Sequence, residues 1–156
     1  MQSYKILSTL KDRLNDAGES DVVLRAKGEK GLETDLLLSF HTAFGNLAGT
    51  ALGQYRFLEF PEEEFDIFDC TVLLTEDIAD DLIQRLCVNI ALVNNELPFG
   101  AFSFDPRTSS LSFRAQVPII SELSDEEITE MADSMISVSL DIAGRYAGGF
   151  WAVMGV

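Results

Sequence analysis

The stretch LPFGAFSFDPRTSSLSFRAQVPII at residues 97–120 decides the fold, because it holds two strands joined by a recognisable turn. Apolar and polar side chains alternate along 100–104 and again along 111–117. Such alternation is typical of a strand with one buried face. Between them, Asp105-Pro106-Arg107-Thr108 puts proline at the second turn position, where its fixed φ is favourable. The stretch therefore predicts an antiparallel hairpin.

A helix is expected on either side of this hairpin. Upstream, an apolar stripe at helical spacing predicts a helix that ends before Pro98, with Thr75 as its N-cap. Its members are Ile78, Leu82, Leu86, Ile90 and Val93. Downstream, Ser124 and Glu127 have the spacing of a capping box and precede a long apolar periodicity, which predicts the last helix.

The N-terminal half predicts one more helix and at least three strands. Residues 3–17 carry a helical apolar stripe, and Ser3 is the expected cap. Strands are expected at 21–27, 34–44 and 65–74. The glycine-rich stretch 45–60 is compatible with a loop or with a further strand at 54–60.

These elements give the order α-β-β-β-α-β-β-α and an α+β fold, with an antiparallel sheet of about five strands and three helices. We expect a single domain over residues 1–156, with 21–27 and 54–60 as candidate edge strands. The predicted core comprises Leu10, Leu38, Val72, Leu82, Leu86, Ile90, Phe102, Phe113, Ile128, Met135 and Ile142.

The net charge of the chain limits the kinds of partner that are expected. Eleven basic and 26 acidic residues give a net charge of −15, and no lysine follows Lys30. Nucleic acid and anionic membranes are therefore excluded as expected partners, because their phosphates require Lys and Arg. A basic or apolar protein partner fits this charge, and so does an acidic surface that only keeps the protein dissolved. No apolar run long enough to span a membrane occurs, so a cytoplasmic protein is expected.

The sequence contains no recognisable catalytic, metal-binding or cofactor-binding motif, so we expect neither an enzyme nor a cofactor. His41 is the only histidine and lies in a strand pattern, which favours a packed or half-exposed side chain. Cys70 and Cys87 lie among apolar positions, which favours buried thiols. A carboxylate-dependent enzyme that uses the acidic residues near 62–66 is the competing interpretation.

Three kinds of segment are candidates for contact with a protein partner. The candidate edge strands at 54–60, which contains Tyr55 and Phe57, and at 21–27 could pair with an extended partner segment by strand addition. The acidic loop near residue 62 is interpreted as an exposed turn, and a docking patch is the alternative. The apolar C-terminal tail either packs on its own domain or contacts a partner or a second subunit. The candidate partner-binding residues are Tyr55, Phe57, Glu62, Glu63, Glu64, Phe150 and Trp151.

The hairpin stretch 97–119, followed by LSDEEITEMADSM at 123–135, resembles the bacterial YbjN family. This family is also labelled sensory-transduction-regulator-like and shares its fold with type III secretion chaperones. The resemblance covers residues 75–147 and supplies no catalytic residue. It implies a small non-enzymatic domain with a chaperone-like or regulatory role that holds a segment of a client protein. A homodimeric structural or regulatory protein without a client is the alternative.

Overall fold

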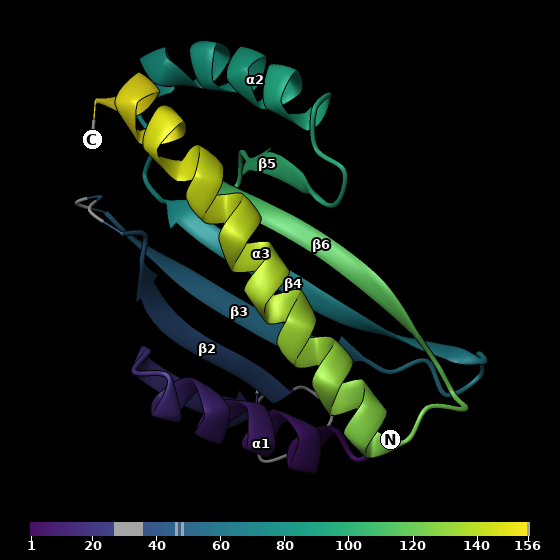
Figure 1. Ribbon diagram of the computed structural model, residues 1–156. Helices are drawn as coiled ribbons and strands as arrows, with labels where there is room; N and C mark the ends of the chain where they lie inside the picture. The colour runs from purple at the N-terminus through teal and green to yellow at the C-terminus, as the bar shows by residue number, and fades with distance from the viewer. Residues whose placement is uncertain (27–35, 46, 48, 156) are drawn as a thin grey trace.

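The computed structural model describes residues 1–155 apart from 27–35, 46 and 48. Within these residues, three helices and six strands form an α+β fold (Figure 1). They are α1 (Ser3–Asp16), β1 (Ser20–Ala26), β2 (Leu36–Ala43), β3 (Thr50–Leu58), β4 (Phe65–Thr75), α2 (Asp80–Asn94), β5 (Ala101–Asp105), β6 (Ser110–Ile120) and α3 (Asp125–Met154). The predicted fold class is confirmed, with one strand more than the five expected.

All strand pairs are antiparallel, and the sheet has the order β1-β2-β3-β4-β6-β5. The predicted hairpin is β5–β6, in which Phe102 pairs with Phe113. β1 is an edge strand, as expected from the predicted strand 21–27, of which residue 27 lies outside the described residues. The prediction of an edge strand at 54–60 is wrong, because β3 lies inside the sheet between β2 and β4.

β3 escaped a firm prediction because Gly53 interrupts its apolar pattern. The strand nevertheless alternates, with Ala51, Gly53, Tyr55 and Phe57 buried. A Cβ at position 53 would lie 2.9 Å from Cε2 of Tyr55 and 3.1 Å from Cζ of Phe40. Glycine therefore leaves room for two stacked rings, whose centroids are 5.7 Å apart.

One face of the sheet, here called the core face, packs against the helices. α3 runs diagonally across the strands, while α1 lies beside β2 (Figure 1). The strands bury their alternate residues on this face, as in Phe68, Cys70 and Val72 of β4. Burial raises the pKa of the Cys70 thiol to about 12.

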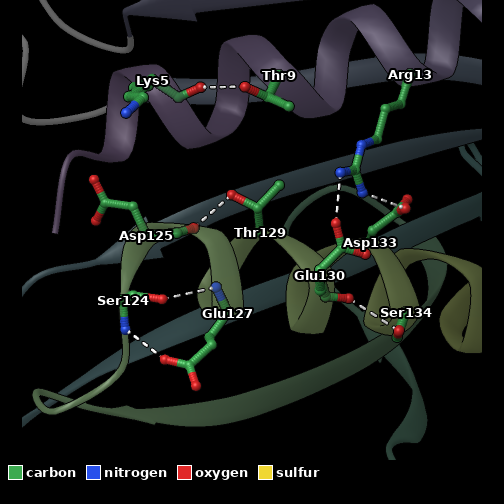
Figure 2. A network of polar contacts seen from close by, with 10 residues as sticks. All are labelled: Lys5, Thr9, Arg13, Ser124, Asp125, Glu127, Thr129, Glu130, Asp133 and Ser134. Atoms are coloured by element: carbon green, nitrogen blue, oxygen red, sulfur yellow. Dashed lines mark hydrogen bonds and ion pairs between the residues drawn. The ribbon is translucent and has the colours of Figure 1, made fainter.

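The predicted capping box of α3 is present. The backbone N–H of Glu127 donates to Oγ of Ser124 at 3.2 Å, and the N–H of Ser124 donates to Oε2 of Glu127 at 2.8 Å (Figure 2). One turn further on, Arg13 of α1 donates to Glu130 at 2.6 Å and to Asp133 at 2.9 Å. These contacts fix the start of α3 and tie it to α1.

The predicted caps of the other two helices are wrong. α2 begins at Asp80 with Ala79 at the N-cap, whereas Thr75 is the last residue of β4. Ser3 is the first residue of α1 and does not cap it, because its hydroxyl donates to Glu59 at 2.5 Å. The hydroxyl of Thr75 accepts a hydrogen bond from Trp151 of α3. Both hydroxyls therefore contact elements that are distant in the sequence, and capping rules based on neighbouring residues do not predict such contacts.

Most of the predicted core is confirmed by burial. Leu82 and Met135 are the exceptions and are only half-buried at the margin of the core. Cys87 is exposed on α2, so the prediction that it is buried is wrong. Its position follows Leu86, which occupies the buried stripe of the helix, and therefore falls outside that stripe.

The C-terminal tail packs on its own domain as the last turns of α3. Phe150 and Trp151 are buried, and the ring centroids of Phe150 and Phe102 lie 4.8 Å apart. Nε1–H of Trp151 donates to the carbonyl of Leu74 at 3.2 Å and to the hydroxyl of Thr75 at 3.0 Å. These contacts decide between the two alternatives left by the sequence.

Candidate functional site

The other side of the sheet, here called the open face, carries the alternate residues of the strands. Within the described part of the chain the helices pack on the core face, so no helix covers this side of the sheet there. Cross-strand pairing arranges its residues in rows. The first row is Phe65–Ile120, and the second is Leu58–Ile67–Pro118. The third row is Arg56–Asp69–Gln116. The fourth row crosses the whole sheet and consists of Val23, Ser39, Gln54, Thr71, Arg114 and Ala101.

The first two rows form an exposed apolar surface, here called the apolar end. It comprises Leu58, Phe60, Phe65, Ile67, Pro118 and Ile120. The exposed fractions of Phe60, Phe65 and Ile120 are 39%, 40% and 53%. The rings of Phe60 and Phe65 lie 5.9 Å apart between centroids. Scattered apolar residues on a surface are ordinary, whereas these three large side chains are adjacent and form a patch.

Acidic side chains border the apolar end and are here called the acidic rim. They are Glu62, Glu63, Glu64 and Glu122, and all are exposed. The turn that carries most of them is fixed by two hydrogen bonds. The N–H of Phe60 donates to Asp66 and the N–H of Glu63 donates to the carbonyl of Phe60, each at 2.9 Å. The rim is therefore held beside the apolar end.

The third row has a buried carboxylate at its centre. Asp69 is only 4% exposed, and its oxygens accept from Nε of Arg56 and Nε2 of Gln116, each at 3.0 Å. A terminal nitrogen of Arg114 lies 3.8 Å away. Hydrogen bonds of this kind offset the cost of removing a carboxylate from water.

The predicted partner-binding residues separate into two groups. Glu62, Glu63 and Glu64 lie in the acidic rim, where the sequence placed them. Tyr55, Phe57, Phe150 and Trp151 are core residues and take no part in the open face. Burial raises the pKa of Tyr55 above its ordinary range, and its hydroxyl is hydrogen-bonded to Ser139 at 2.9 Å.

The sequence analysis missed Phe60, Phe65 and Ile120. The sequence does indicate them, because Phe60 and Phe65 flank the acidic turn. In the alternating patterns of β3 and β4 they fall on the same face as the exposed residues. Ile120 likewise follows a buried residue, Ile119, at the end of β6. Consecutive apolar residues at a strand end place one side chain on each face.

Other kinds of site were also considered in the described ranges. No group of three or more His, Cys, Asp and Glu side chains there could hold a metal ion. His41 is half-exposed, with Nδ1 3.5 Å from Asp21. None of the helices in the described residues is long and apolar enough to cross a membrane.

Comparison with known proteins finds a likeness to a solved structure. No protein-family model and no curated protein sequence matches the chain. The fold is similar to the crystal structure of YbjN from E. coli, whose description proposes a role in transcription regulation. The two chains are 13% identical, the match covers 86% of this chain and 90% of YbjN, and the TM-score is 0.42.

Proposed function

We propose that this domain binds a segment of a partner protein on the apolar end of its open face and catalyses no reaction. The observation that carries the proposal is the cluster of Phe60, Phe65 and Ile120, exposed on a sheet face and bordered by the acidic rim. An apolar centre with a charged border is the usual anatomy of a protein-binding surface. The role is chaperone-like or regulatory.

The proposal includes the chemistry of the partner segment. Apolar side chains of the partner would cover the apolar end, and each fully buried large side chain contributes about 1.5–3 kcal/mol. Lys or Arg residues next to them would face the four glutamates of the acidic rim. The net charge of −15 also attracts a basic segment before contact and so accelerates association.

A defined peptide tests this proposal. We expect a fluorescent peptide with alternating apolar and lysine residues to bind the wild-type protein, measured by anisotropy. The double variant Phe65→Ser and Ile120→Ser should bind about tenfold more weakly or worse, because two partly exposed apolar contacts are lost. The triple variant with Glu62, Glu63 and Glu64 replaced by glutamine should associate more slowly and show a smaller salt effect on the association rate.

The matched control is Val88→Ser on α2, which also removes an exposed apolar side chain but lies outside the open face. It should leave peptide binding unchanged. Equal binding by the wild-type protein and the Phe65→Ser and Ile120→Ser variant would refute the proposed surface. An association rate that ignores salt in the wild-type protein would remove the acidic rim from recognition.

A second candidate function is a homodimer joined through α2. Val88 and Leu92 are 56% and 61% exposed and lie four residues apart, on one side of the helix. A two-fold contact would bury this pair against its copy. Sedimentation equilibrium at increasing concentration should then show a dimer for the wild-type protein and a monomer for the variant Val88→Ser and Leu92→Ser. A wild-type monomer at all concentrations would exclude this candidate.

A further inference from the structure

We propose that a pocket at the centre of the open face binds the carboxylate of an acidic residue of the partner segment. The pocket has a volume of about 110 Å³ and is lined by Leu37, Gln54, Arg56, Asp69, Thr71 and Arg114. It lies between the third and fourth rows, beyond the apolar end. The inference rests on the proposed function, since the partner segment supplies the carboxylate.

The lining residues offer more donors than the protein itself uses. Arg56 donates only through Nε to Asp69, so within the described chain its two terminal nitrogens have no hydrogen-bond partner. Arg114 is half-exposed and stands 3.8 Å from the same carboxylate. The amide of Gln54 and the hydroxyl of Thr71 complete the wall. Two guanidinium groups at one small pocket are suited to the planar, bidentate recognition of a carboxylate.

The local charge is opposite to that of the whole chain. Arg25, which pairs with Leu37 at the margin of the pocket, joins Arg56 and Arg114 on the open face. Within the lining, the two positive charges of Arg56 and Arg114 are opposed by Asp69 alone. At physiological salt the Debye length is about 8 Å, so the distant acidic surface is largely screened. A singly charged carboxylate fits this balance, whereas Asp69 would repel the second charge of a phosphate.

The distance along β4 between the apolar end and the pocket determines how a partner segment could reach both. Phe65 and Asp69 lie four residues apart on β4, and a strand rises about 3.3 Å per residue, so they are about 13 Å apart. An extended segment that runs along the strands would place apolar residues on the apolar end and, about four residues away, an Asp or Glu over the pocket. Its basic residues would remain at the acidic rim.

Titration with sodium acetate at constant ionic strength, followed by the NMR signals of Arg56 Nε–H and of the Thr71 and Arg114 amides, tests the pocket alone. We expect saturable shifts with acetate and weaker binding of inorganic phosphate. Arg114→Gln should weaken acetate binding about tenfold or more. Arg107→Gln is the matched control, because Arg107 is an exposed arginine on the β5–β6 turn and should have no effect.

A second titration connects the pocket to the partner. The alternating peptide with a Glu four residues from its apolar anchor should bind more tightly than its Gln counterpart, and Arg114→Gln should abolish that difference. Shifts that do not saturate, equal weakening by Arg107→Gln, or tighter binding of phosphate would overturn the inference. Acetate binding should survive in the Phe65→Ser and Ile120→Ser variant. If the wild-type protein binds the peptide but not acetate, the pocket proposal is rejected and the proposed function stands. If it binds acetate but not the peptide, the proposed function is rejected.

Discussion

Replacing Phe113 by alanine should lower the free energy of unfolding by about 3–5 kcal/mol. Phe113 is fully buried on the core face, where it pairs with Val72 of β4 on one side and with Phe102 of β5 on the other. Its ring packs against Phe102 with the centroids 5.3 Å apart. A Cβ at Gly100, which has φ +69°, would lie 2.3 Å from Cζ of Phe113. The backbone thus approaches the ring closely, and the cavity left by alanine could not collapse readily.

The matched control is Phe65→Ala, which deletes the same atoms from the same sheet. Phe65 is 40% exposed on the open face, so its removal should cost less than about 1 kcal/mol. Urea denaturation followed by circular dichroism gives both values. Similar losses in the two variants would mean that the core face and the open face have been assigned wrongly.

The sequence predicted well those features that short-range chemistry determines. The β5–β6 hairpin follows from alternation around a proline turn, and the capping box of α3 follows from Ser124 and Glu127. β3 was not predicted firmly, because the glycine that makes room for Tyr55 and Phe40 also breaks the local pattern. A pattern within one strand does not reveal which rings approach it from the neighbouring strands.

The candidate site was predictable only in its charged part. Three consecutive glutamates at 62–64 indicate an exposed turn by themselves, whereas the apolar end depends on the pairing of Phe65 with Ile120 across β4 and β6. The pocket is similar, because Arg56 and Arg114 are 58 positions apart in the chain and meet only at Asp69. The register of the strands makes these residues neighbours, and no pattern within a single strand predicts that register.

Trp151 presents the opposite case, a residue interpreted as a partner contact that holds its own domain together. Trp151→Ala should lower the free energy of unfolding by about 3–5 kcal/mol. The indole is 5% exposed, lies 6.2 Å from Phe44 between ring centroids, and donates to the carbonyl of Leu74. The indole therefore stabilises the packing of the end of α3 against the end of β4.

Trp151→Phe separates the two contributions of this side chain. Phenylalanine keeps most of the apolar contact but removes the N–H donor to Leu74 and Thr75, so we expect a loss of about 1–2 kcal/mol. Because Trp151 is the only tryptophan, unfolding must be followed by circular dichroism. If Trp151→Ala unfolded at the wild-type urea concentration, the tail would not stabilise the domain, and its contact with a partner would again be the better interpretation.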